Sequence, residues 1–320
     1  MDAQLEIVRE NPMSRIPAPV HTTYSPRKPV DLRQTLGQLG HGPRDPTTSW
    51  DAAGLWRTFR TPDGPVTLRL TCVSSGIDVT AWGAGADWAI AGVPELLGSS
   101  DDWSRLEVGG HPLLRDVLHR NPGIRLTRTR LVFEALVPAI LEQRVTCVEA
   151  YRSWAQLVRA YGQPAPGPAP AGLCVVPSPQ QWRQIPSWQW HRAGVDPRRS
   201  LAVVTAAAVA SGLERTLAPG LTGAEVARKL TSVAGIGVWT AAETVQRSHG
   251  DPDAVSVGDY HLASFVGVAL IGKKVDDDGM LELLEPWAGQ RQRVIRLILA
   301  SGCKPERHGP RARIQDHRRH

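Results

Sequence analysis

The sequence LTSVAGIGVWTAA occupies residues 230–242 and determines which architecture the chain can adopt. Gly235 and Gly237 lie between two segments that carry apolar residues at helical spacing. The first opens with the capping-box sequence TGAE at residues 222–225, and the second runs from residue 238 to 249, before Gly250. Because glycine tolerates a positive φ and a close approach of the backbone to another molecule, the pattern predicts a hairpin of two helices joined by a short turn.

The turn of this hairpin is suited to an anion. The first amides of the helix after Gly237 lack intrahelical acceptors and carry the positive end of the helix dipole. A DNA phosphate would fit there, with Gly235, Ile236 and Gly237 as the contacting residues. An ordinary tight turn between two helices is the alternative interpretation. A dinucleotide-binding fingerprint is excluded, because such a motif follows a strand whereas this one follows a capped helix.

The segments around the hairpin also have helical patterns. Apolar stripes at residues 133–141 and 148–158 predict two helices, and Asp196-Pro197 predicts the start of a helix that ends at Gly212. Two more helices are expected at residues 259–269 and 286–301. No internal repeat is evident. We therefore expect residues 126–303 to form one helical domain.

The first part of the chain has a different texture. Seven prolines within residues 1–46 predict an extended or disordered leader. Runs rich in Val, Leu, Thr and aromatic residues predict antiparallel strands at 55–59, 66–72 and 77–82, followed by a helix at 87–97. Residues 47–125 are thus expected to form a small β-rich α+β domain.

Charge is concentrated at the other end of the chain. Residues 304–320 hold six Lys and Arg side chains against two acids, a net +4 out of the formal +6 of the whole chain. The composition predicts a solvated basic arm, and contact with nucleic acid is the second interpretation.

Four groups of motifs follow one another along the chain. They are GIRL at residues 123–126, FEAL with AILEQRVT at 133–146, AGIGVWTA at 234–241 with VSVGDYHL at 255–262, and the segment 287–299. In order and spacing they resemble the helix-hairpin-helix (HhH-GPD) DNA glycosylase superfamily, and within it the DNA-3-methyladenine glycosylase II family. The resemblance covers residues 105–303. It implies a mainly α fold, split by a DNA-binding and active-site cleft, with a small N-terminal α+β domain on its flank.

The resemblance assigns the essential carboxylate of the family to Asp259. A position near a helix N-terminus favours its ionised form, and the alternative interpretation is that Asp259 only caps its helix. The neighbouring acids of residues 276–278 are expected to be solvated surface. In the implied reaction, base excision repair of alkylated purines of the 3-methyladenine type, the nucleotide is flipped out of the duplex and Asp259 stabilises the oxocarbenium-like state during hydrolysis of the glycosidic bond.

Trp239 stands where bifunctional members of the superfamily carry a lysine. Since tryptophan cannot form a Schiff base, the resemblance implies a monofunctional enzyme without AP lyase activity. Trp239 is expected either to stack on an electron-poor base or to belong to the core. Two positions at which the family often has pocket aromatics fall on Glu243 and Leu299, so the base pocket departs from the usual aromatic cage. Four aromatic and histidine side chains could compensate, although core packing is the more common role: Trp182, Trp188, Trp190 and His191.

Two further roles follow from the resemblance. Gln143 and Arg144 align with the family segment that inserts into the DNA gap, although an exposed cation or a phosphate contact is an equal alternative for Arg144. The family also tends to hold a monovalent cation on carbonyls of the hairpin, here those of Thr231, Val233 and Ile236. No other cofactor is expected, because four dispersed cysteines without a CxxC pair cannot hold a ferredoxin-type Fe-S cluster.

Composition limits the remaining possibilities. The longest apolar stretch is far shorter than the 18 or so residues of a membrane span, and no secretory h-region opens the chain. We expect a cytoplasmic monomer with reduced cysteines that acts on damaged double-stranded DNA. The alternatives are a non-catalytic DNA-binding module and the same fold acting on deaminated or oxidised bases.

Overall fold

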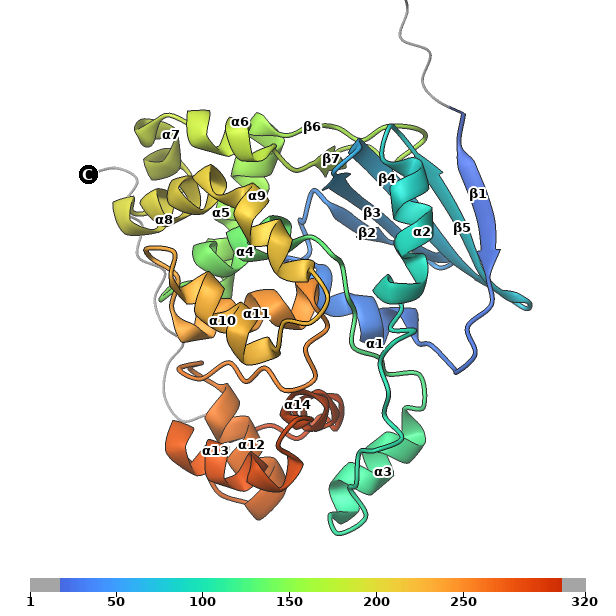
Figure 1. The fold of residues 1–320 in the computed structure, drawn as a ribbon, viewed down its shortest axis with the longest axis vertical. Helices are drawn as coiled ribbons and strands as arrows, with labels where there is room; N and C mark the ends of the chain where they lie inside the picture. Colours follow the sequence, from blue (N-terminus) through green and yellow to red (C-terminus); the bar gives the residue numbers. More distant parts are fainter. Residues whose placement is uncertain (1–17, 307–320) are drawn as a thin grey trace, which may run out of the picture.

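The computed structural model describes residues 18–306, and its N-terminal part is an antiparallel sheet backed by a helix (Figure 1). The strands lie in the order β1-β5-β4-β3-β2. The elements of this part are β1 (Val20–Tyr24), α1 (Leu32–Leu36), the 3-10 helix η1 (Gly37–Leu39), β2 (Thr48–Trp50), β3 (Gly54–Thr61), β4 (Gly64–Val73), β5 (Gly76–Trp82) and α2 (Ala86–Leu96). The three strands and the helix expected between residues 55 and 97 are confirmed.

One face of the sheet carries an apolar core. Leu70 on β4 pairs with Leu55 on β3 and with Val79 on β5, and all three side chains are buried. Helix α2 lies over this face and adds the buried Ala89 and Val93. Period-2 burial on the strands and a one-sided helix thus produce a small core of their own.

The expectation of an extended leader is wrong for residues 18–46. Strand β1 pairs with β5 along its whole length, and α1 begins at a cap in which the Asp31 side chain accepts the Gln34 amide at 2.9 Å. Leu32 and Leu36 are buried in the core of the sheet domain. Four of the prolines, at 26, 29, 43 and 46, lie between these elements, and β1 is a polar edge strand, so neither gave an apolar signal in the sequence. Residues 1–17 lie outside the described part.

The central part is a set of helices packed around α4. It consists of α4 (Val132–Leu141), α5 (Cys147–Tyr161), the short strands β6 (Gln163–Pro164) and β7 (Cys174–Val175), α6 (Pro179–Gln184), α7 (Ser187–Arg192), α8 (Pro197–Ala208), α9 (Ala210–Glu214), the 3-10 helix η2 (Arg215–Leu217), α10 (Gly223–Thr231) and α11 (Val238–Ser248). Helix α4 is apolar on nearly all sides and packs against α5, α8 and α11, so it forms the axis of this core. The predicted caps at Asp196 and Thr222 are confirmed.

One predicted helix differs in length. The helix that begins after Asp196 breaks at Val209 and continues as α9, instead of running straight to Gly212. Val209 has ψ 14°, outside the helical range, while Ala206 and Ala210 on either side are both buried. The bend lets α8 and α9 bury different faces against the same core, a tertiary effect that local helical patterning does not contain.

The third part joins distant segments. It consists of α3 (Pro112–Arg120), α12 (Leu262–Ile271), α13 (Asp277–Leu284), the 3-10 helix η3 (Glu285–Trp287) and α14 (Arg291–Ala300). Leu114 and Val117 of α3 are buried with Val294 and Ile298 of α14. The expected domain boundary at residue 125 is therefore wrong, because α3 precedes it in sequence but packs with the C-terminal helices.

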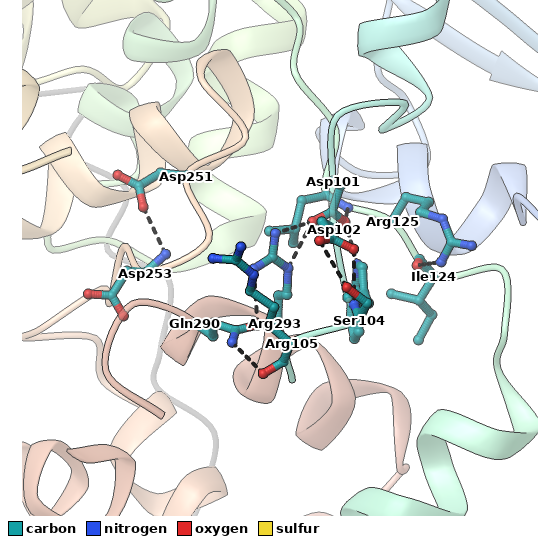
Figure 2. A network of polar contacts seen from close by, with 12 residues as sticks. Asp101, Asp102, Ser104, Arg105, Ile124, Arg125, Asp251, Asp253, Gln290 and Arg293 are labelled. Atoms are coloured by element: carbon teal, nitrogen blue, oxygen red, sulfur yellow. Dashed lines mark hydrogen bonds and ion pairs between the residues drawn. The ribbon is translucent and has the colours of Figure 1, made fainter. Parts of the chain in front are cut away.

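A buried ion pair fixes this long-range packing (Figure 2). Asp101, which follows α2, accepts Arg293 Nη2 of α14 at 2.6 Å and the Leu126 amide at 2.6 Å. Arg105 offers its carbonyl to Gln290 Nε2 at 2.8 Å in the same cluster. Because a buried charge must be paired, the cluster ties the segment after the sheet domain to the start of α14.

Within residues 18–306, no single helix is long and apolar enough to cross a membrane. The pair α8 and α9–η2, bent by 69°, passes by length and composition. In the fold, however, Val203, Ala206 and Leu213 of this pair are buried in the central core.

Candidate active site

The hairpin between α10 and α11 is built around one glycine with a left-handed backbone. Gly235 has a φ of +88°, and a Cβ added to it would lie 2.6 Å from the Cβ of Ala202. Gly237 has a φ of −92° and open space around it. The predicted positive φ is thus confirmed for Gly235 only, whereas Gly237 leaves the surface of the turn open.

The start of α11 faces outward. Gly237 is its N-cap, and among the described residues no side chain caps the helix. Val238, the first helical residue, is 66% exposed. The Ile236 side chain is buried, so any DNA contact by Ile236 would be through its backbone. The exposed amides at this end favour an anion.

Asp259 lies just before α12 and divides its oxygens between two partners. Oδ1 accepts the amides of His261 and Leu262 at 2.8 and 2.9 Å. Oδ2 accepts the indole N–H of Trp239 at 3.2 Å. The helix starts at Leu262, three residues later than expected, and the carboxylate satisfies its first amides. Asp259 is not itself the N-cap, which is His261, but it accepts the amides of the cap and of the first helical residue, and the same side chain also bonds α11.

Trp239 on α11 is half-buried, and its partner Asp259 lies 20 residues later in the chain, just before α12. Its neighbours on α11, Thr240 and Ala241, are buried, whereas Trp239 keeps part of its ring accessible. The sequence did not predict the bond from Trp239 to Asp259, because it depends on how the 251–258 segment returns to α11. A stacking role for the ring stays a prediction.

Glu243, one turn beyond Trp239, is engaged in a polar cluster. Its Oε1 accepts the Ser256 hydroxyl, and its Oε2 pairs with Arg247 Nη1 at 2.7 Å. Leu299 is 46% exposed on α14. The described interactions join Glu243 to the segment that carries Asp259, whereas they do not link Leu299 to it.

The residues after α4 brace the hairpin from the other side. Gln143 Nε2 donates to the Gly235 carbonyl at 3.0 Å and to Thr240 Oγ1 at 2.9 Å. Arg144 is exposed and has a φ of +54°, a conformation that costs a non-glycine residue about 1 kcal/mol or more. Gln143 thus supports the turn, and Arg144 projects from a strained backbone next to it. Insertion of either residue into DNA stays a prediction.

Helix α5 adds two side chains that the sequence did not identify. Burial raises the pKa of the Cys147 thiol, and the carboxylates of Glu142 and Asp259 add to the rise. Burial likewise raises the pKa of Tyr151 to about 12, again with a contribution from Glu142. Both groups therefore stay protonated at neutral pH, and the influence of Asp259 on the pKa of Cys147 places the start of α5 near this carboxylate. Only the tertiary packing of α5 reveals this.

Two members of the aromatic cluster at residues 182–191 belong to the core and not to a pocket wall. Trp182 and Trp190 are buried in the central core, where their rings stack with centroids 5.7 Å apart. Trp188 is 60% exposed and His191 is exposed. The core interpretation is correct for the two buried tryptophans, and the compensating role is wrong for them.

The acids at 276–278 are not simply solvated surface. Asp276 caps α13 through the Gly279 amide at 2.9 Å. Asp277 accepts the Gly258 amide at 3.0 Å, directly before Asp259. Within residues 18–306, no group of three or more His, Cys, Asp or Glu side chains could hold a metal ion.

The sequence was compared with protein families and with curated proteins. No protein-family model matches the chain. It is 31% identical over 168 residues, 52% of its length, to a protein of Mycobacterium tuberculosis (strains CDC 1551 / Oshkosh and ATCC 25618 / H37Rv) named "Probable bifunctional transcriptional activator/DNA repair enzyme AlkA". The match covers 32% of that protein, so the chain spans about a third of the length of these curated relatives.

Solved structures agree in fold. The 3-methyladenine DNA glycosylase of Archaeoglobus fulgidus superposes with a TM-score of 0.71 at 18% identity, over 88% of this chain and 98% of that one. The 8-oxoguanine glycosylase/lyase of Clostridium acetobutylicum, bound to double-stranded DNA, gives 0.66 at 13% identity, over 85% and 91%. The chain is therefore similar in sequence to AlkA over about half of its length, and its fold is that of the helix-hairpin-helix DNA glycosylases.

Proposed function

We propose that this chain is a monofunctional DNA glycosylase that hydrolyses the glycosidic bond of alkylated purines in double-stranded DNA. The observation that carries the proposal is the Asp259 carboxylate, held by the first amides of α12 and by Trp239. Similarity to AlkA supports the repair of alkylated bases, and the name of the A. fulgidus neighbour agrees with it. The protein would act as a monomer.

The proposed mechanism uses the hydrogen-bond acceptor position that remains free on the Asp259 carboxylate. Each carboxylate oxygen has two acceptor positions. Oδ1 uses both for amides, whereas Oδ2 uses one for Trp239. The remaining position on Oδ2 can face the sugar or the attacking water. A flipped nucleotide would bring its anomeric carbon here, where the negative charge stabilises the oxocarbenium-like state.

Alkylation at N3 or N7 makes the purine cationic and therefore a better leaving group. One carboxylate can then suffice without a strong general acid, so the proposed substrates suit a site with Asp259 as its reacting carboxylate. Trp239 cannot attack the sugar as an amine would, which supports hydrolysis without strand cleavage. Borohydride reduction during turnover should therefore trap no covalent enzyme–DNA adduct, and a trapped adduct would refute the monofunctional assignment.

DNA would be held by local contacts. The outward amides at Gly237 would bind a phosphate, and Arg144, projecting from its strained turn, would enter the gap left by the flipped base. A monovalent cation would sit on the carbonyls of Thr231, Val233 and Ile236. Thr231 ends α10, where helix carbonyls lack intrahelical donors, and neutral carbonyls suit such an ion. The Val233 carbonyl also accepts the Ile236 amide at 3.1 Å, which leaves one of its two acceptor positions for the ion.

Mass spectrometry of the bases released from methylated duplex DNA tests the function directly. We expect 3-methyladenine and 7-methylguanine from the wild type and none from Asp259→Asn, which should still bind DNA. Retained binding without any base release by the wild type would favour a non-catalytic DNA-binding module. Release of deaminated or oxidised bases alone would favour the same fold with another substrate, and an active Asp259→Asn would refute the catalytic assignment.

A further inference from the structure

The segment that delivers Asp259 is held at Ser256. Ser256 is 3% exposed and lies between α11 and α12. Its hydroxyl donates to Glu243 and accepts Gln246 Nε2 at 2.9 Å. Its carbonyl accepts the amide of Asp259 at 3.2 Å. One buried serine therefore connects the side chains of α11 to the backbone of Asp259.

Helix α11 holds Asp259 through two contacts, one direct and one through Ser256. Trp239 and Glu243 are four residues apart and project from the same face of the helix. Trp239 bonds the carboxylate itself, whereas Glu243 bonds the residue whose carbonyl holds the Asp259 amide. The two contacts fix the carboxylate and the backbone of Asp259 relative to one helix.

We propose that Glu243 is a positioning residue for the glycosylase reaction, which it serves by holding Ser256 and thereby the backbone of Asp259. This inference rests on the proposed function, because positioning has a kinetic meaning only if Asp259 acts on the sugar. It gives Glu243 a role other than lining the pocket, which is the role that the family resemblance implied for this position.

The surroundings of Glu243 suit this role. Arg247 donates to Glu243 Oε2 at 2.7 Å and to the Gln38 carbonyl of η1 at 3.1 Å. Burial alone would lower the pKa of Arg247, but the carboxylates of Glu243 and Glu142 outweigh it and raise that pKa. Arg247 thus stays charged and immobilises Oε2, which leaves Oε1 to accept the serine hydroxyl. The carboxylate is oriented before any substrate binds.

The geometry of a catalytic group is worth a large factor in rate. A displacement of about 1 Å can cost about 100-fold. We therefore expect Glu243→Leu and Ser256→Ala each to lower the single-turnover rate at saturating enzyme by about 30-fold. Glu243→Gln keeps an oxygen for the Ser256 hydroxyl and should stay within about threefold of the wild type. Affinity for duplex DNA with a tetrahydrofuran abasic analogue should not change in any of the three.

Two further measurements separate positioning from a general loss of structure. The double variant Glu243→Leu/Ser256→Ala should be no slower than either single variant, because each substitution breaks the same connection from Glu243 through Ser256 to Asp259. Amide hydrogen exchange should accelerate in the peptide covering residues 254–260 and stay unchanged in β3 and β4. The control is Glu95→Leu on α2, which removes a carboxylate that pairs with Arg128 at 3.2 Å. This variant should leave both readouts unchanged.

The readouts distinguish the possible failures. Additive rate losses, or unchanged exchange at 254–260 in Glu243→Leu, would overturn the positioning role even if the enzyme is active. If the wild type releases no base from methylated DNA, the proposed function is refuted, and Glu243 then has no catalytic role to serve. Since exchange needs no turnover, it reports on the Glu243–Ser256 contact in either case.

Discussion

Asp259 combines two roles that seemed to compete in the sequence. Oδ1 satisfies the first amides of α12, while Oδ2 accepts Trp239 and keeps one acceptor position free. Capping and catalysis would use different oxygens, so the cap orients the carboxylate that the reaction would need. The sequence predicted the importance of Asp259 through a motif, but its partner Trp239 became visible only in three dimensions.

Trp239→Phe isolates the indole N–H from the aromatic ring. Phenylalanine keeps a surface for stacking but cannot donate to Asp259 Oδ2, and a hydrogen bond to a charged group contributes about 1.5–3 kcal/mol. We expect the single-turnover rate to fall by about tenfold or more, with little change in affinity for abasic-analogue DNA. A full rate in Trp239→Phe would show that the ring contributes only by stacking or packing.

The two hairpin glycines should respond differently to alanine. Gly235→Ala combines a φ of +88° with a Cβ 2.6 Å from Ala202, so we expect a loss of about 2 kcal/mol in the free energy of unfolding. Gly237→Ala meets open space at a φ of −92° and should change stability by less than about 1 kcal/mol.

For DNA affinity we expect Gly237→Ala to be the variant with the larger loss relative to its loss of stability. An alanine methyl at Gly237 stands where a phosphate would approach the amides of α11, so Gly237→Ala should weaken DNA binding although the fold is intact. Thermal melts and binding titrations of both variants check this. Equal DNA affinity of Gly237→Ala and wild type would contradict a phosphate site at this turn.

The contact between α4 and β3 makes stability depend on pH. Burial, opposed by Arg57 and the Arg60 amide, raises the pKa of Glu134 from its ordinary value of 4.5 to about 7. The folded state therefore binds a proton that the unfolded chain has released between these pH values. The contribution of Glu134 to stability is complete below pH 4.5 and falls as pH rises to about 7.

Glu134→Gln should remove this dependence. Relative to the wild type, the variant should gain up to about 3 kcal/mol in the free energy of unfolding between pH 5 and pH 8. Burial also lowers the pKa of His249 to about 4, which makes stability rise with pH in both proteins, so this effect cancels in the difference. Urea titrations at several pH values measure it, and a constant difference would contradict the raised pKa of Glu134.

Local signals predicted the individual elements better than their packing. The capping box at Thr222, the cap at Asp196 and the strands around Leu68 each follow from residues close in sequence. The break at Val209 does not, because it results from the way α8 and α9 bury separate faces. Ser256 was equally invisible, since its role depends on side chains of α11.

The same limit applies to the whole molecule. Asp101 and Arg293 are 192 residues apart, and the residues around either one form no sequence pattern that predicts their ion pair. Helix α3 was therefore assigned to the wrong side of a boundary, and β1 was missed because an edge strand needs few apolar residues. The family motifs supplied Asp259 and the hairpin, whereas the pairing of Trp239, Glu243 and Ser256 around them required the fold.

Net charge gives the last prediction. The basic arm at residues 304–320 carries +4 of the +6, so the rest of the chain has little general attraction for DNA. Each phosphate neutralised by a Lys or Arg contributes about −0.9 to the slope of log affinity against log salt. A chain that ends at Cys303 should therefore have a shallower slope, by up to about 5 for six contacts. Its single-turnover rate at saturating enzyme should match the full chain, because Asp259 and its partners on α11 are intact. An identical salt slope in both proteins would assign DNA binding entirely to the hairpin and the cleft.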